Sequence, residues 1–149
     1  MELYEEFTKI IKGFNKNRIK YAVIGGFAMG FYDNPRFTKD IDILTISTQV
    51  EKIKRFLLSI DFEEAAPPWM FKTSKLILHR FGKIENDETL MLDILIGEDE
   101  FYKKVIVNAL GVKSENGIVK IATKEDLIKL KLKRNSDQDK IDIKRLKKS

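Results

Sequence analysis

The chain has 149 residues, of which 43% are hydrophobic and 10% aromatic, and it carries a net charge of +5 at pH 7. This composition excludes an intrinsically disordered chain, and the length is enough to bury a core. The absence of cysteine excludes disulfides, thiolate catalysis and cysteine-ligated zinc, and a single histidine cannot build a histidine metal site. No apolar run approaches 18 residues and the N-terminus lacks a signal-peptide layout, so we expect a cytoplasmic protein with no membrane partner.

The first third of the chain predicts a phosphate-binding turn. A stripe of apolar residues predicts a helix over residues 3–16. The β-type run 21–24 ends in Gly25 and Gly26, and a short helix is predicted over 27–32. The glycines allow a sharp turn and the close approach of a ligand, and the first amides of the helix would attract an anion.

A strand is predicted over residues 40–46, and it carries two carboxylates. The alternation of a strand puts Asp40 and Asp42 on the same face. Beside a phosphate-binding turn, such a pair suits a Mg²⁺-bound nucleotide. The alternative is that both aspartates simply face solvent. A second Asp-x-Asp, at residues 137–139, lies in a polar stretch and is predicted to be solvated surface or a helix start.

The middle of the chain is predicted to contain a helix, a proline break, two strands and a polar turn, at residues 50–60, 65–68, 70–73, 75–81 and 83–88. Ser47 or Thr48 is the expected N-cap of the helix. His79 is expected to be an ordinary strand residue.

Asp93 is the only charged residue in the apolar run 90–96 (LMLDILI), which predicts a strand buried on both faces. A carboxylate at such a position needs a cation or strong hydrogen-bond donors. If this strand lies beside residues 40–44, Asp93 completes a three-carboxylate cluster that could hold one or two Mg²⁺ ions. The alternative is that Asp93 caps a neighbouring backbone segment.

The last part of the chain is predicted to form helix 98–109, strand 117–121, a helix capped by Thr123, and helix 137–147. The whole pattern predicts an α+β domain of two layers over residues 1–149, with a mixed β-sheet flanked by helices and with C-terminal helices from about residue 123 packing on it. Residues 120–149 carry a net charge of +6 and the rest −1. This basic segment is either a patch for a triphosphate or RNA, or the solvated face of charged helices.

Together, Gly25-Gly26, the Asp-Ile-Asp-Ile sequence at 40–43 and the isolated Asp93 resemble the nucleotidyltransferase superfamily of the polymerase-β type. The stretch GGFAMGFYDNPRFTKDIDIL is most similar to the small AbiEii-type and other minimal nucleotidyltransferases, and the matching residues are Arg36, Thr38, Asp40 and Asp42. The segment 126–146 resembles the closing segment of that family, with Lys131, Asp139 and Asp142 at matching places. Ser136 stands where the family usually has arginine, and Arg134 is the candidate substitute.

The resemblance, over residues 20–146, implies a transferase that moves a nucleoside monophosphate from a nucleoside triphosphate such as ATP to an acceptor hydroxyl. The cofactor would be Mg²⁺ or Mn²⁺, and the acceptor RNA, tRNA or protein. The implied metal ligands are Asp40, Asp42 and Asp93, and the implied triphosphate ligands are Gly25, Gly26, Arg36 and Lys131. Arg36 could instead brace its loop, and Lys131 could be a surface lysine.

Several roles fit this resemblance. The protein could be the toxin of a toxin–antitoxin pair, with a cognate antitoxin protein as partner. It could instead be a non-catalytic nucleotide-binding or antitoxin-like protein, which three intact carboxylates argue against. A small-molecule, antibiotic-type nucleotidyltransferase is the third role. Such enzymes tend to carry His-Asp before Asp-x-Asp, where this chain has Thr38-Lys39.

Overall fold

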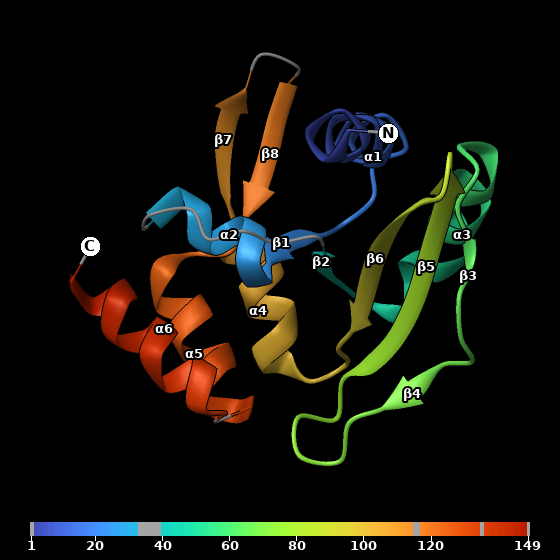
Figure 1. Ribbon diagram of the computed structural model, residues 1–149. Coiled ribbons are helices and arrows are strands. Elements are labelled where there is room, and N and C mark those ends of the chain that lie inside the picture. Colours follow the sequence, from blue (N-terminus) through green and yellow to red (C-terminus); the bar gives the residue numbers. More distant parts are fainter. Residues whose placement is uncertain (1, 33–39, 115–116, 135, 149) are drawn as a thin grey trace.

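The computed structural model describes residues 2–32, 40–114, 117–134 and 136–148. Within these ranges the chain forms a mixed sheet of order β3-β5-β6-β2-β1-β8-β7, with β4 beside β5, and six α-helices that flank it (Figure 1). The predicted α+β class with a mixed sheet is therefore confirmed. No helix in the described part of the chain is long and apolar enough to cross a membrane.

The strands are β1 (Ala22–Ile24), β2 (Asp40–Thr45), β3 (Glu63–Glu64), β4 (Trp69–Met70), β5 (Ile77–Glu85), β6 (Glu88–Ile96), β7 (Leu110–Ser114) and β8 (Gly117–Ile121). The helices are α1 (Leu3–Lys16), α2 (Gly25–Tyr32), α3 (Val50–Ser59), α4 (Glu100–Asn108), α5 (Lys124–Arg134) and α6 (Asp137–Lys148), with a short 3₁₀-helix η1 (Ser47–Gln49) before α3. The predicted bounds of α1 and β8 are confirmed, whereas β3 and β7 were not anticipated.

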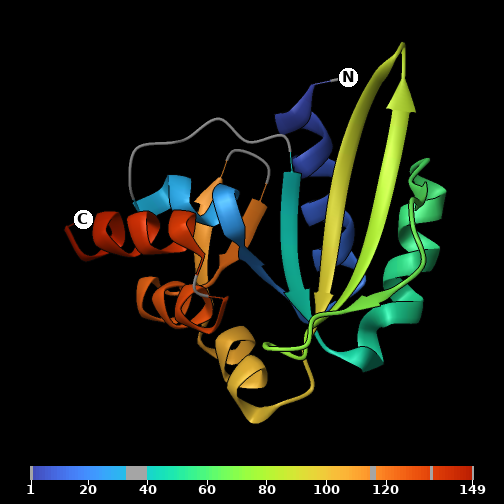
Figure 2. The same ribbon diagram turned by 60° about the horizontal axis from the view of Figure 1, so that its bottom comes forward.

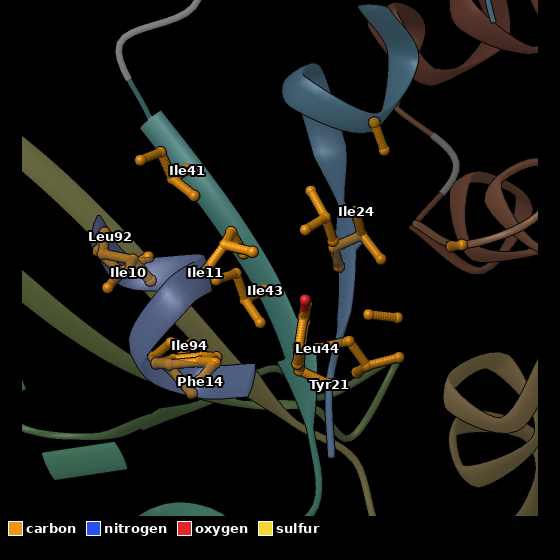
Figure 3. Close-up of a cluster of buried hydrophobic side chains, with 14 of the residues drawn as sticks. Ile10, Ile11, Phe14, Tyr21, Ile24, Ile41, Ile43, Leu44, Leu92 and Ile94 are labelled. Carbon is orange, nitrogen blue, oxygen red and sulfur yellow. The ribbon is translucent and has the colours of Figure 1, made fainter. Parts of the chain in front are cut away.

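A large part of the core lies between α1 and one face of the sheet. Figure 3 shows Phe14 and its helix neighbours against Ile41 and Ile43 of β2 and Ile94 of β6, and these side chains are nearly inaccessible to solvent. Because side chains alternate along a strand, burying the isoleucines of β2 on α1 turns its aspartates to the opposite face. The packing of α1 thus decides which face of the sheet carries charge.

The predicted polar turn at residues 83–88 is wrong. β5 runs to Glu85 and β6 begins at Glu88, so only Asn86 and Asp87 connect them. Both have positive φ (50° and 63°), as a two-residue hairpin turn of type I′ requires. Lys83 is tolerated inside the strand because its Nζ is 3.0 Å from Oε1 of the buried Glu6 on α1.

The predicted N-cap of α3 is also wrong. Ser47 and Thr48 belong to η1, and Gln49 stands at the cap position without a side-chain cap bond. The Gln49 side chain instead accepts a hydrogen bond from the Lys20 amide, 3.0 Å away. The cap of α5 is as predicted, since the Asp126 amide donates to Thr123 Oγ1 at 3.0 Å.

Candidate active site

Three strands bring one acidic row together on the sheet face opposite α1. In the strand registers, Asp42 on β2 is the partner of Asp93 on β6, and Asp93 is in turn the partner of Arg80 on β5. On its other side Asp42 is paired with Ile24, the residue before Gly25. Figure 2 shows β2, β6 and β5 side by side in this order. The predicted neighbourhood of Asp42 and Asp93 is therefore confirmed by the parallel pairing of β2 with β6.

Arg80 supplies the cation that Asp93 was expected to need. Its Nε lies 2.8 Å from Asp93 Oδ1 and its Nη2 lies 3.0 Å from Oδ2, so the guanidinium holds both oxygens. Such a two-point pair is stronger and more directional than a single ion contact. Sequence reasoning missed Arg80, because only the register of the β5–β6 hairpin places it opposite Asp93.

Asp42 lies in a less well compensated position. Its pKa is raised from 3.8 to about 7, first by burial and then by the negative charges of Asp93 and Asp40. The more distant charges of Arg134 and Arg80 only partly oppose this effect. A bound cation would stabilise the ionised form of Asp42.

Gly25 makes room for the Asp42 side chain. Helix α2 begins at Gly25 itself rather than two residues later as predicted, and Gly25 has a positive φ of 69°. A Cβ atom at this position would lie 2.2 Å from Asp42 Oδ2. The absence of a side chain is therefore required both by the backbone conformation and by the neighbouring carboxylate. Gly26 is buried in the first turn of α2.

The other predicted site residues are less closely grouped. Asp40 opens β2 and is exposed, and Arg36 and Thr38 lie outside the described residues. No three acidic or histidine side chains of the described chain are arranged as a metal-binding group. His79 is half-buried in β5, as an ordinary strand residue, and burial lowers its pKa.

A buried ionic network joins α5 to α6. Lys131 Nζ lies 3.0 Å from Asp142 Oδ2 and 3.9 Å from Asp139 Oδ1. Arg134 holds Asp139 through two nitrogens, with Nε at 2.8 Å from Oδ2. Gln138 donates to Asp142 as well. These contacts explain why both aspartates have no exposed surface.

The network decides between alternatives that the sequence left open. Residues 137–139 form a helix start, as one alternative predicted, and Asp139 lies in the first turn of α6. Asp139 is not solvated, because it faces α5 and meets Arg134. Lys131 is not a surface lysine, since only 5% of the residue is exposed. Burial alone would raise the pKa of Asp139, but hydrogen bonds from Arg134 and Ser136 outweigh it and lower that pKa well below its ordinary value. Ser136, where the sequence resemblance led us to expect arginine, accepts from the Asp139 amide as a helix cap.

The acidic row and the two cations of this network line one cavity of about 410 Å³. Among its lining residues are four of the predicted site residues: Gly25, Asp42, Asp93 and Lys131. Arg134, which the sequence offered as a substitute arginine, also lines it, together with three basic residues that the sequence did not place there: Lys72, Arg80 and Lys133. The C-terminal basic segment thus contributes cations to a cavity, although many of its other lysines are exposed.

The rest of the cavity wall is apolar and well fixed. Its apolar side chains come from β1, β5, β6, α4, α5 and the segment before β5: Ile24, Phe71, Leu76, Leu78, Leu95, Tyr102, Leu127 and Leu130. The Tyr102 hydroxyl donates to the Ser74 carbonyl at 2.6 Å, which ties the segment 71–76 to α4.

Comparison with known proteins identifies the fold. No family profile and no curated protein matches the sequence. TM1012 from Thermotoga maritima, a presumed nucleotidyltransferase, superposes with a TM-score of 0.64 at 16% identity, covering 93% of this chain and 89% of that one. The lincosamide antibiotic adenylyltransferase LnuA, bound to lincomycin, gives 0.64 at 16% identity, with 96% and 95% covered.

A third structure, ANT(2″)-Ia in complex with adenylyl-2″-tobramycin, gives a TM-score of 0.60 at 14% identity, covering 95% of this chain and 86% of that one. The chain therefore has the fold of these nucleotidyltransferases. At these identities the likeness concerns the fold alone, and the AbiEii-type subgroup remains a prediction from the sequence.

We expect Gly25→Ala to lower stability by roughly 1–3 kcal/mol from backbone strain, and to displace the Asp42 carboxylate in addition. The two effects separate in a double-mutant cycle with Asp42→Ala, measured by urea unfolding. Gly25→Ala should cost less in the Asp42→Ala background, because the clashing oxygen is gone. Equal costs in both backgrounds would show that Asp42 is not what excludes a side chain.

The raised pKa of Asp42 predicts a pH-dependent stability without metal. The native carboxyl keeps its proton at pH values where the unfolded one has lost it, so stability should fall as pH rises from 3.8 to about 7. Asp42→Asn should remove this part of the pH dependence. At pH 8 in EDTA, Asp42→Asn should have a free energy of unfolding roughly 2–4 kcal/mol higher than that of the wild type, measured by urea unfolding. Each tenfold change in proton affinity corresponds to about 1.4 kcal/mol. A less stable variant at pH 8 would contradict the assignment.

Proposed function

We propose that this protein is a divalent-metal-dependent nucleotidyltransferase that moves a nucleoside monophosphate from a nucleoside triphosphate to an acceptor hydroxyl. The observation that carries the proposal is the placement of Asp42 beside Asp93, in a cavity bounded by the start of α2 on one side and by the cations of α5 on another. Within a nucleotidyltransferase fold, this arrangement offers a metal site next to a phosphate site.

The donor set suits Mg²⁺ or Mn²⁺. Carboxylate oxygens are the ligands these ions prefer, and the described residues only partly compensate the charge that Asp42 carries when it is ionised. Asp40, on the same strand face, is the proposed third ligand, and its side chain would turn toward Asp42 and Asp93 when an ion binds, because the three are not arranged as a metal-binding group without one. The chemistry that divalent ions supply at such a site is the neutralisation of charge on the attacking and leaving oxygens.

The protein's own groups have separable roles in this proposal. The amides at Gly25 and Gly26 would donate to the triphosphate at the start of α2. Lys131 and Arg134 would neutralise its charge from α5, and Arg36 would do so from the segment before β2. The acceptor oxygen attacks the α-phosphorus, its proton passes to Asp93, and the bond to pyrophosphate breaks.

The acceptor hydroxyl is proposed to belong to RNA, tRNA or a protein, with an antibiotic-type small molecule as the second candidate. The second candidate is favoured by the fold likeness to LnuA and ANT(2″)-Ia. The resemblance of the sequence to AbiEii-type proteins supports a toxin role beside a cognate antitoxin protein. A non-catalytic nucleotide-binding protein would have no need to retain both Asp42 and Asp93.

The central test is transfer of label from α-labelled nucleoside triphosphates to total RNA, tRNA or protein, with and without Mg²⁺. Asp93→Asn and Asp42→Asn should each reduce transfer by at least roughly a hundredfold. Asp61→Asn is the matched control, since Asp61 is exposed and asparagine tolerates its positive φ. Turnover like that of the wild type in Asp42→Asn, on an acceptor that the wild type modifies, would refute the proposal.

Lys131 is predicted both to stabilise the fold and to bind the nucleotide. Lys131→Met leaves Asp142 buried without its lysine, so stability should fall by roughly 3 kcal/mol, and ATP affinity in calorimetry should fall as well. Lys129→Met changes an exposed residue of the same helix and should alter neither quantity. If Lys131→Met loses stability but binds ATP as the wild type does, Lys131 is a structural residue only.

A further inference from the structure

The row of paired residues across the sheet gives the cavity two chemically different ends. Gly25 lies next to Ile24 at one end of the row, Asp42 and Asp93 occupy its centre, and Arg80 lies at the other end on β5. If the triphosphate lies at Gly25 and α5, as the proposed function requires, the β5 end is left for the acceptor. The inference that follows rests on that proposed function.

Arg80 is paired with Asp93, the carboxylate that the proposed metal site and proton transfer require. Its guanidinium donates to both oxygens of Asp93, so a metal ion would compete with this cation for the carboxylate. The two partners differ in exposure, since 40% of the Arg80 side chain is accessible to solvent against 11% for Asp93. The arginine can therefore leave the pair and remain hydrated, whereas the carboxylate cannot leave the cavity.

The β5 end of the cavity is built as a separate subsite. Leu78 and Leu95 are register partners, and they lie two residues along their strands from Arg80 and Asp93, on the same face. The segment 71–76, which includes Lys72, closes this end and is fixed by the bond from Tyr102 to Ser74. The subsite thus offers an apolar floor, a rigid wall and two cations.

The charge of the cavity identifies the kind of acceptor. Five basic and two acidic side chains line it. On α5, Lys131 and Arg134 already have Asp142 and Asp139 as partners. Arg80 has only Asp93 as an ion-pair partner among the described residues, and it would lose that partner to a metal ion. A guanidinium released there favours an anion and repels a polycation.

We propose that Arg80 is an acceptor-binding residue, which exchanges Asp93 for an anionic group of the acceptor once a metal ion takes that carboxylate. The acceptor is therefore a hydroxyl compound that carries a phosphate or carboxylate group near the reacting oxygen. Binding is ordered, with metal before acceptor. A polycationic aminoglycoside acceptor is excluded.

The first experiment tests the exchange without any turnover. Mn²⁺ is titrated into the nucleotide-free protein and followed by electron paramagnetic resonance, for the wild type, Arg80→Gln and Arg55→Gln. Arg80→Gln should bind Mn²⁺ roughly fivefold more tightly, because the competing cation is gone. Arg55 is an exposed arginine of α3 outside the cavity, and its variant should bind like the wild type. Unchanged or weaker Mn²⁺ binding by a folded Arg80→Gln protein would overturn the exchange.

The second experiment tests the acceptor chemistry. With Mg²⁺ and a non-hydrolysable ATP analogue bound, calorimetry compares uridine with uridine 5′-monophosphate, which differ only by the phosphate, and adds a short oligoribonucleotide. A preference for the phosphorylated compounds that disappears in Arg80→Gln supports the proposal. If only the oligonucleotide binds, the acceptor is a nucleic acid. If the monophosphate binds as well, small phosphorylated compounds are also acceptors.

Two results separate this inference from the proposed function. Equal binding of uridine and its phosphorylated counterparts, in the presence of the bound analogue, would overturn the role of Arg80 and leave nucleotidyl transfer standing. Failure of the wild type to bind the analogue would count against the proposed function itself. Arg80→Lys retains the charge but not the two-point geometry, and it should recover only part of the phosphate preference, which guards against a folding defect in Arg80→Gln.

Discussion

Two carboxylates on adjacent strands of one sheet face are the constraint that the rest of the structure accommodates. Asp42 and Asp93 are brought together by the parallel pairing of β2 with β6, and like charges at this spacing disfavour the folded state. Residues on both sides of the pair accommodate these two charges. Arg80 neutralises Asp93 from β5, and Gly25 leaves the space that Asp42 occupies. An arrangement that costs stability and is nevertheless built so specifically is typical of a functional site.

The C-terminal helices bury positive charge, as the sheet buries negative charge. They carry cations toward the cavity, and burying Lys131 would be costly if Asp142 did not meet it. Buried ion pairs of this kind contribute little net stability, but they fix where each charge lies. In Figure 1, α5 and α6 lie across the molecule from the β5–β6 hairpin, so the cations of α5 and Arg80 approach the carboxylates from different sides. Under the proposed function, the cavity consequently has a triphosphate side and an acceptor side.

Local pattern was sufficient to predict most elements and the acidic centre of the site. Apolar stripes define α1 and α3, and the apolar run around Asp93 marks a buried strand whose charge needs a partner. What the sequence could not supply were pairings set by distant segments. Arg80 meets Asp93 only because a two-residue turn at 86–87 fixes the hairpin register, and the polarity of Lys83 concealed that turn. Asp139 is buried only because another helix provides Arg134.

Because side chains alternate between the two faces of β6, the site also disfavours a misaligned β6. A slip of one residue against β2 would move the whole side-chain set of β6 to the opposite face. Asp93 would then point into the layer formed by Ile10, Ile11 and Phe14, and Leu92 or Ile94 would enter the charged row. Burying a carboxylate among those side chains without a partner would cost several kcal/mol. The residue proposed for catalysis therefore also penalises the wrong strand alignment, so replacing Asp93 by leucine would remove a safeguard of folding fidelity along with the chemistry.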